Sequence, residues 1–275
     1  MPNPTHYMMP ILSSSSTGHK IGRVLIVAGS DPSAGAGLQA DLKTVTALGG
    51  YGMTAVTAIT VQDTENVSRV VPLPAELVVE QMRVCLDDIG ADVIKLGMLA
   101  TREIVIAVSA LLASRPPVPV VADPVLAGTG GGVLLEGLGH DAFVRKLLPC
   151  VTLLTPNLSE AARLSGWPVT SVPEMERAAC VLMEMGARSV LVTGGHLTGE
   201  VVTDWLQTEG GGHCFSDTRL PGPGFHGTGC VLSSAIATHL AMGTSLRDAV
   251  NAGRLYVRGA MQKSLQLGRG QRLLV

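Results

Sequence analysis

Short apolar runs alternate with segments of helical spacing through most of this sequence, and this alternation constrains the fold more than any other feature. The first run, Val24–Ala28, is continuous, apolar and followed by Gly29, which is typical of a strand buried on both faces. The next segment, Gly37–Leu48, carries apolar residues at helical spacing. Such alternation predicts right-handed crossovers and a mostly parallel sheet with helices on both faces.

The same pattern continues as far as residue 193. The further strands are expected at Met53–Val61, Val93–Gly97, Val118–Asp123, Val151–Thr155 and Ser189–Thr193. The further helices are expected at Ala75–Asp88, Glu103–Ala113, Leu138–Leu147, Ser159–Leu164 and Pro173–Met185.

Past Thr193 the pattern changes. Val201–Gln207 and His213–Leu220 predict an antiparallel hairpin at a sheet edge, and the helices Gly229–Ala241 and Leu246–Gln262 follow it. No Pro/Ser-rich linker and no internal repeat interrupts the body of the chain. The sequence therefore predicts an α/β protein with one domain over residues 21–275.

Composition excludes several classes of protein. The chain has 275 residues, 46% of them hydrophobic and 15% charged, with a formal net charge of −2, so it is not intrinsically disordered. It has no Lys/Arg run that would attract nucleic acid or an anionic membrane. Its longest apolar runs, such as Ile104–Ala113, fall well short of the roughly 20 residues of a spanning helix. We expect a soluble globular protein that binds neither nucleic acid nor membrane.

The cysteines and the first 20 residues bear on the cellular compartment. Five cysteines form an odd set without a Cys-x-x-Cys pair, which predicts reduced thiols and a cytoplasmic location. Residues 1–20 contain the run Ser13–Ser16 but no basic region followed by an apolar core, so they do not resemble a signal peptide. We expect residues 1–20 to be a disordered leader.

The first glycine cluster runs from Gly29 to Gly37, between a predicted strand and a predicted helix. Glycines there let the backbone approach a ligand, and the helix that follows offers its N–H groups. Gly35-x-Gly37-x-x-Ala40 also fits a loose dinucleotide-binding pattern, with Asp63 near the end of the next strand. No P-loop pattern occurs anywhere. A ligand-free, tight strand-to-helix turn stays open as the alternative.

The second cluster is His226-Gly-Thr-Gly-Cys230, at the start of a predicted helix. The amides of Gly227, Thr228 and Gly229 would point to a common position, where the helix dipole also favours negative charge. We expect an anion hole there. The helix N-terminus predicts a lowered pKa for the Cys230 thiol. A buried structural cysteine after a glycine turn is the alternative.

Asn157 and Glu160 follow the predicted strand Val151–Thr155. An amide and a carboxylate three residues apart suit a hydrated Mg²⁺ that keeps most of its waters. The same spacing also suits a capping box, with Asn157 as N-cap. The residues alone leave both interpretations open.

Polar or small residues follow other strands as well. Asp123 and Thr193-Gly-Gly-His196 each end a predicted strand, where open α/β sheets place their ligands. Gln62 follows Met53–Val61, and its carboxamide offers a donor and an acceptor to an aminopyrimidine edge. Each residue also has an alternative interpretation when taken alone. Asp123 is equally typical of a helix or loop cap, and Gln62 of a solvated loop residue. Their shared sheet edge favours a ligand site.

Five motifs in this order carry a family resemblance. They are Ala28-Gly-Ser-Asp-Pro-Ser-Ala-Gly-Ala-Gly-Leu-Gln-Ala-Asp-Leu-Lys-Thr44, Lys95-Leu-Gly-Met-Leu99, Thr155-Pro-Asn-Leu-Ser-Glu160, Gly194-Gly-His196 and His226-Gly-Thr-Gly-Cys230. Together they resemble the hydroxymethylpyrimidine/phosphomethylpyrimidine kinases of thiamine biosynthesis, in the ribokinase-like superfamily. The likeness covers roughly residues 23–262. It implies a three-layer ribokinase-like fold with a small antiparallel edge, and a homodimer.

The resemblance also implies an activity. ATP would phosphorylate the 5-hydroxymethyl group of 4-amino-5-hydroxymethyl-2-methylpyrimidine, and a second phosphorylation would give the diphosphate. The implied substrate-binding residues are Gln62, Gly29, Asp41, Thr60, Met98 and Val125. The implied catalytic residues are Gly227, Thr228, Gly229 and Cys230. The implied ATP-binding residues are Asn157, Thr193, Gly195 and Asp123, and the implied Mg²⁺ residues are Glu160 and Asp123.

Three positions depart from the family pattern. Ala34 replaces a glycine, Thr193 replaces a lysine that reaches the ATP phosphates, and Phe225 replaces a small polar residue. Three other functions compete with the implied one. They are a pyridoxal/pyridoxine kinase, an NAD(P)-binding oxidoreductase, and a catalytically silent pyrimidine-binding sensor.

Overall fold

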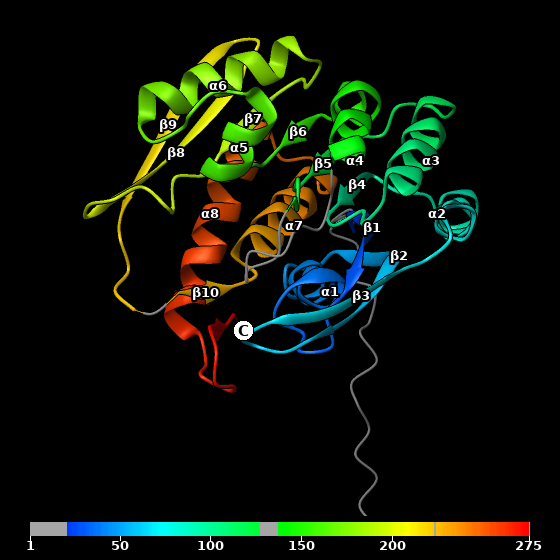
Figure 1. Ribbon diagram of the computed structural model, residues 1–275, viewed down its shortest axis with the longest axis horizontal. Helices are drawn as coiled ribbons and strands as arrows, with labels where there is room; N and C mark the ends of the chain where they lie inside the picture. The colour runs from blue at the N-terminus through cyan, green and yellow to red at the C-terminus, as the bar shows by residue number, and fades with distance from the viewer. Residues whose placement is uncertain (1–20, 127–136, 223, 275) are drawn as a thin grey trace, which may run out of the picture.

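A computed structural model describes residues 21–126, 137–222 and 224–274. The expected leader, residues 1–20, lies outside the described residues. The central strand is β1 (Arg23–Ser30), which pairs in parallel with β2 (Tyr51–Gln62) on one side and β4 (Val93–Leu96) on the other. The sheet order β3-β2-β1-β4-β5-β6-β7-β8-β9 therefore changes direction at β1 (Figure 1). The remaining parallel strands are β5 (Val120–Ala122), β6 (Leu153–Leu154) and β7 (Val190–Val192).

Antiparallel strands form both ends of this sheet. β3 (Val67–Pro72) pairs with β2 at one end. β8 (Val201–Thr208) and β9 (Gly211–Thr218) form the expected hairpin at the other. β3 itself was not predicted from the sequence.

Apolar residues of β1 alternate between two cores. Leu25 and Val27 face one core, and Val24 and Ile26 face the other; all four are fully buried. The first core packs against α2 (Ala75–Asp88), α3 (Arg102–Ala113), α4 (Gly137–Ala142), α5 (Leu158–Ser165) and α6 (Val172–Glu184). The second packs against α1 (Gly37–Ala47), α7 (Thr228–Ala241) and α8 (Leu246–Lys263). The predicted three-layer α/β architecture is confirmed.

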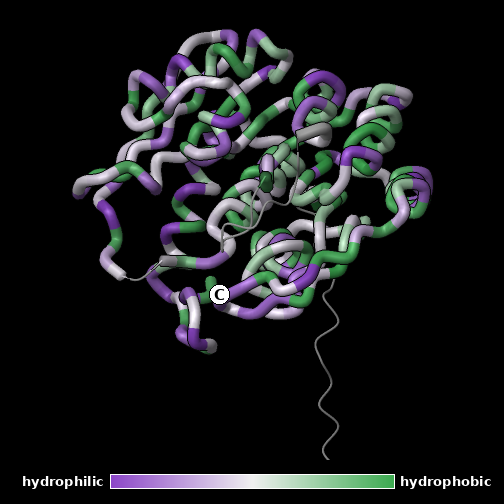
Figure 2. Tube along the Cα trace, viewed as in Figure 1, coloured by the Kyte–Doolittle hydropathy of each residue, from purple (hydrophilic) through white to green (hydrophobic). Residues whose placement is uncertain are grey.

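The surface helices show the expected amphipathic pattern. On α2, Val78, Val79 and Met82 are buried, and hydrophobic and hydrophilic positions alternate around its turns (Figure 2). No helix within residues 21–126, 137–222 and 224–274 combines the length and apolar character needed to cross a membrane.

The expected helix Leu138–Leu147 is interrupted. α4 ends at Ala142 and continues as a π-helical turn, Phe143–Leu147, and a 3₁₀ turn, Leu148–Cys150. Pro149 lacks a backbone N–H and its ring excludes a regular preceding α-helical turn, so the helix cannot continue unchanged into the next strand.

A small second sheet closes one side of the molecule. β10 (Phe225–His226) pairs in parallel with β11 (Arg272–Leu273), and the sequence predicted neither strand. Just before β11, the Gly270 amide donates to the Thr64 hydroxyl (3.0 Å) and the Gln271 amide donates to the Thr64 carbonyl (3.1 Å). The end of the described chain thus joins the β2–β3 loop to the start of α7.

Candidate active site

One large cavity lies along the carboxyl ends of the parallel strands. It measures about 1010 Å³, which suffices for a nucleotide and a small acceptor together. It spans the place where the strand order changes direction, the usual ligand position in open α/β sheets. All but one of the predicted site residues line it: Gly29, Thr60, Gln62, Met98, Asp123, Val125, Asn157, Glu160, Thr193, Gly195, Gly227, Thr228, Gly229 and Cys230.

Asp41 is the exception. Its carboxylate is completely buried between α1 and the sheet, where Lys95 Nζ lies 2.7 Å from Oδ2 and the Ser234 hydroxyl donates to Oδ1 (2.8 Å). Asp41 does not line the cavity. The expectation that it shapes the acceptor pocket by direct contact is corrected to a buried ion pair beneath the site.

Two glycine loops interlock at the position of the predicted anion hole. Gly227 is the N-cap of α7 and has a φ of +77°, which strains any residue with a side chain. A Cβ at residue 227 would also lie 1.9 Å from the Gly35 carbonyl oxygen. A Cβ at Gly229 would lie 3.2 Å from Asp123 Oδ2, so that carboxylate borders the hole. The glycine turn thus lies at the N-terminus of a 14-residue helix, where the sequence predicts an anion hole.

The Cys230 thiol lies in the first turn of α7, but its pKa moves opposite to the prediction. Burial raises this pKa to about 12; the Lys95 ammonium opposes the shift, and the Asp41 and Asp123 carboxylates add to it. The prediction of a lowered pKa is wrong, because burial beside carboxylates outweighs the helix N-terminus. In the unliganded protein Cys230 is a protonated thiol at neutral pH.

Asn157 and Glu160 form the capping box that one interpretation required. The Glu160 amide donates to Asn157 Oδ1 and the Asn157 amide donates to Glu160 Oε2, both at 3.0 Å. Both residues also line the cavity, so the cap does not remove them from the site.

Two buried carboxyl groups at this end of the cavity carry raised pKa values. Burial and the charge of Asp123 raise the pKa of Glu160 to about 8. Burial raises the pKa of Asp123 to about 6, although the Lys95 ammonium opposes it. A cation beside these two carboxyl groups would stabilise their ionised forms. Within the described ranges no three His, Cys, Asp or Glu side chains gather to hold a metal alone, so a cation here needs water or phosphate ligands.

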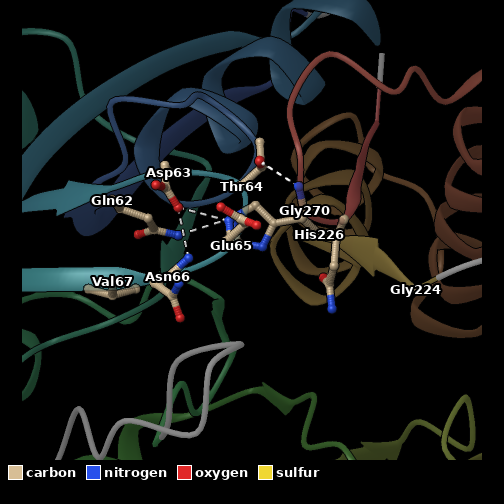
Figure 3. Close-up of a pocket in the computed structure, with 10 residues that line it drawn as sticks. Gln62, Asp63, Thr64, Glu65, Asn66, Val67, Gly224, His226 and Gly270 are labelled. Carbon is tan, nitrogen blue, oxygen red and sulfur yellow. Dashed lines mark hydrogen bonds between the residues drawn. The ribbon is translucent and has the colours of Figure 1, made fainter.

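The Gln62 carboxamide has a polar neighbour at each end. It is the last residue of β2, and its Nε2 lies 3.0 Å from His226 Nε2 (Figure 3). The Thr60 hydroxyl lies 3.3 Å from Gln62 Oε1 and donates to the Ser30 carbonyl at 2.8 Å. His226 Nε2 also lies 3.4 Å from Asp31 Oδ2. Asp31 and His226 were not predicted as site residues, although both occur in the quoted motifs.

Comparisons with known proteins show the family of this chain. The family model described as phosphomethylpyrimidine kinase matches residues 31–274. This chain belongs to that family. The hydroxymethylpyrimidine/phosphomethylpyrimidine kinase of Streptomyces coelicolor is 43% identical over 247 residues, which cover 90% of this chain and 91% of the relative. The thiamine biosynthesis bifunctional protein of Geobacter sulfurreducens is 42% identical, covering 90% of this chain; the chain spans about half (51%) of that longer relative.

The solved structure of a pyridoxal kinase is similar to this chain over most of its length. The pyridoxal kinase of Staphylococcus aureus, solved in complex with AMP-PCP and pyridoxal, is 34% identical with a TM-score of 0.85. The match covers 93% of each chain. The predicted ribokinase-like fold is confirmed. Membership of this family removes the oxidoreductase interpretation of Gly35 and Gly37. Gly35 packs against His226 and Gly227, and Gly37 packs against Gly29 and Asp31.

In this member of the phosphomethylpyrimidine kinase family, hydrogen bonds to the backbone stabilise the end of the cavity that Thr193 and Gly195 line. The Thr193 amide donates to the Pro156 carbonyl (2.9 Å), and the Gly194 amide donates to Asp204 Oδ1 (2.8 Å). Arg254 Nε lies 2.6 Å from the other Asp204 oxygen, and Arg219 Nη1 donates to the Gly195 carbonyl at 2.7 Å. Both arginines line the cavity, and the sequence patterns did not single them out.

Proposed function

We propose that this chain is an ATP-dependent kinase of thiamine biosynthesis. It phosphorylates the 5-hydroxymethyl group of 4-amino-5-hydroxymethyl-2-methylpyrimidine and then the monophosphate. The name of the Streptomyces coelicolor relative, hydroxymethylpyrimidine/phosphomethylpyrimidine kinase, supports both steps. One observation carries the proposal: the Gly227–Cys230 anion hole and the Gln62 carboxamide line the same cavity. Phosphoryl transfer needs chiefly this combination of positioning and charge stabilisation.

The acceptor ring binds between Gln62 and the start of the β1–α1 loop. A Cβ at Gly29 would lie 2.3 Å from Met98 Cε, so glycine there keeps the methionine packed flat against the strand end. Met98, Thr60 and Val125 complete the wall. Apolar sides with one polar clamp suit a small heteroaromatic ring.

ATP occupies the opposite end of the cavity, along Asn157, Thr193, Gly195 and Asp123. The Staphylococcus aureus kinase binds the ATP analogue AMP-PCP on the same fold, which supports nucleotide use. Thr193 supplies a hydroxyl where a lysine is usual. Because the amides of Thr193 and Gly194 are already bonded within the protein, positive charge near the phosphates comes from the neighbouring arginines. Arg219 and Arg254 line this end of the cavity.

Mg²⁺ is held by Glu160 and Asp123, with water and phosphate oxygens as its other ligands. The raised pKa values of these two buried carboxyl groups support this assignment, since a dication favours their ionised forms. The metal supplies neutralisation of the phosphate charge.

Cys230 acts within the anion hole rather than as the proton acceptor. Its raised pKa means that the thiol carries a hydrogen at neutral pH and donates it, together with the amides of Gly227 and Gly229, to the transferred phosphoryl oxygens. Asp123 borders Gly229, so its assignment to Mg²⁺ places the metal beside the anion hole.

The kinase works as a cytoplasmic homodimer in this proposal. All five cysteines are free thiols, which agrees with a reducing compartment. Ile59, Val61 and Val71 expose 43–52% of their surface on the paired strands β2 and β3. Apolar side chains grouped on an edge of the sheet suit contact with a second copy.

The test is a coupled ADP-release assay with Mg-ATP and three acceptors: the hydroxymethylpyrimidine, its monophosphate and pyridoxal. Turnover of the first two supports the proposed function. Turnover of pyridoxal alone supports the second candidate, a pyridoxal kinase, which the likeness to the Staphylococcus aureus enzyme favours. Binding of the pyrimidine without turnover of any acceptor indicates a catalytically silent sensor.

A further inference from the structure

We propose that Arg219 binds the phosphates that ADP retains after transfer, with a guanidinium held in place by the β7–β8 loop, residues 193–200. The inference rests on the proposed function, in which ATP occupies this end of the cavity. Of the two arginines described there, Arg219 supplies the positive charge and Arg254 does not.

Arg219 follows β9 directly and is bonded to the loop that joins β7 to β8, at the antiparallel end of the sheet (Figure 1). Nη1 donates to the Gly195 carbonyl at 2.7 Å, and Nε donates to the Gly199 carbonyl at 2.8 Å. Nη2 donates to the carbonyl of Leu197, which lies between them in the loop. The backbone amide of Arg219 adds a bond to the Glu200 carbonyl at 2.7 Å. The guanidinium is therefore held against alternate carbonyls of a single loop.

The β7–β8 loop is itself anchored to the sheet where it begins. The Gly194 amide donates to Asp204 Oδ1 (2.8 Å), and a Cβ at residue 194 would lie 1.8 Å from the Thr203 carbonyl oxygen. Only glycine allows such a close approach to β8. Gly195 and Arg219 both line the cavity, so the anchored loop holds Arg219 at the cavity wall.

Arg219 retains its positive charge, whereas two carboxylates neutralise Arg254. Arg254 Nε lies 2.6 Å from Asp204 Oδ2, and its Nη2 lies 2.8 Å from Asp217 Oδ2. One cation and two carboxylates sum to a net charge of −1, which does not attract phosphate. The partners of the Arg219 guanidinium are neutral carbonyls, and within the described ranges it forms no ion pair.

The hydrogen bonds of Arg219 leave two N–H groups for a ligand. A guanidinium has five N–H donors, and the loop carbonyls use three of them. One N–H remains on each terminal nitrogen, and phosphate oxygens are strong acceptors for such charged donors. In the proposed function the Gly227–Cys230 anion hole takes the transferred phosphoryl group. Arg219 lies beside Gly195 at the nucleotide end instead, so it meets the phosphates that stay on ADP.

The experiment compares Arg219→Met with the wild-type chain by calorimetric binding of Mg-ADP, Mg-AMP-PCP and the pyrimidine, and by competitive inhibition with adenosine. Methionine removes the charge and all donors of the side chain. We expect both nucleotide Kd values to rise about tenfold or more, the scale of hydrogen bonds to a charged group. The Ki of adenosine, which has no phosphate, and the Kd of the pyrimidine should each change less than about twofold.

Two further variants separate the charge of Arg219 from its effect on the loop. Arg219→Lys keeps the charge but cannot reach all three carbonyls, so it should raise the ADP Kd less than Arg219→Met does. Arg258→Met is the matched control, because Arg258 also lines the cavity but is held only by the Thr218 carbonyl (2.7 Å). It removes the same charge and should raise the ADP Kd less than about threefold.

An unchanged ADP Kd in folded Arg219→Met overturns the assignment and leaves the proposed function intact. Equal losses for adenosine and ADP would show that Arg219 only orders the loop, and equal losses in Arg258→Met would show that its position is immaterial; either result also overturns the assignment. Arg219→Gln, which keeps neutral donors for the loop, gives the same comparison where Arg219→Met does not fold. A wild-type chain that binds neither Mg-ADP nor Mg-AMP-PCP overturns both proposals.

Discussion

Lys95 Nζ lies 2.7 Å from Asp41 Oδ2, and both side chains are completely shielded from solvent beneath the anion hole. Burial alone would lower the pKa of Lys95, but Asp41, Cys230 and Asp123 outweigh it and raise that pKa, so the ammonium stays charged. A fixed positive charge therefore lies under the position where phosphate charge is expected to develop.

Removing one partner of this pair should strongly destabilise the protein. Lys95→Met leaves the Asp41 carboxylate buried without its counter-ion, and we expect a loss of about 3–5 kcal/mol in the free energy of unfolding. Urea denaturation measures it. The double variant Lys95→Met/Asp41→Leu should recover most of the loss, and Arg115→Met, which breaks the surface pair with Asp87, should change little. A single variant as stable as wild type would contradict the buried pair's role.

Gly227→Ala should damage both stability and turnover. The new Cβ meets the Gly35 carbonyl at 1.9 Å in addition to the strain of a positive φ. We expect a loss of more than about 2 kcal/mol and a fall in kcat of about 100-fold or more. Gly243→Ala is the matched control: its φ is +90°, but nothing lies within 4 Å of the added Cβ, so only the backbone strain of about 1 kcal/mol should appear. Equal losses at the two positions would argue against interlocked loops.

Cys230→Ala should lower kcat by about 100-fold or more, since it removes one donor from the anion hole. Cys230→Ser retains an O–H donor and should lose less. In the metal-free protein the raised pKa predicts that Cys230 reacts with iodoacetamide more slowly than the exposed Cys214 at pH 8, as peptide mass spectrometry would show. Near-wild-type turnover of the alanine variant would remove Cys230 from the mechanism.

Glu160 makes the stability of the metal-free protein depend on pH. Its folded-state pKa of about 8 lies above the roughly 4.3 of an unfolded chain, so the stability contributed by the protonated carboxyl is full below about pH 4 and is lost as the pH rises through 8. We expect Glu160→Gln, which keeps an acceptor for the Asn157 amide, to exceed wild type by about 1–3 kcal/mol at pH 9 in EDTA. Urea titrations from pH 5 to 9 measure the slope. Glu176→Gln on the exposed face of α6 should leave that slope unchanged, and identical slopes for all three proteins would contradict the assignment.

Gln271 carries a buried carboxamide oxygen that has no hydrogen-bond partner among the described residues. Such an atom costs about 1–3 kcal/mol, so Gln271→Met should keep or raise stability, by up to about 1 kcal/mol. Gln39→Met is the matched control, because that carboxamide accepts from the Asp31 amide (2.9 Å) and donates to the Ser30 hydroxyl (2.8 Å). It should lose about 1–2 kcal/mol. Thermal unfolding of both variants decides the matter, and a larger loss at Gln271 would show that its oxygen is satisfied in solution.

The central sheet could be predicted because its strands carry their own signal. Val24–Ala28 is apolar at every position, and the parallel strand that results is buried on both faces. β3 carries no such signal: its side chains are exposed or half-buried, and it is ordered by pairing with β2. β10 and β11 have two residues each, too few for any periodicity.

The site residues could be predicted where one strand end or one loop places them. Gln62 and Glu160 are examples, because both lie at the carboxyl edge that the alternation of strands and helices already implied. The contact between Gln62 and His226 could not be predicted, since it depends on how two distant segments meet. The Cys230 thiol shows a different limit: its helix N-terminus was visible in the sequence, but the carboxylates packed beside it were not.

The small β10–β11 sheet has a consequence for how the protein is made. Residue 226 contacts Gln62, but its strand is completed only by Arg272 and Leu273. The wall beside the acceptor therefore cannot form until Arg272 and Leu273 have left the ribosome. A chain truncated before residue 272 should still fold its central sheet but lack the finished wall of the active site, so loss of this short segment should abolish activity before it unfolds the protein.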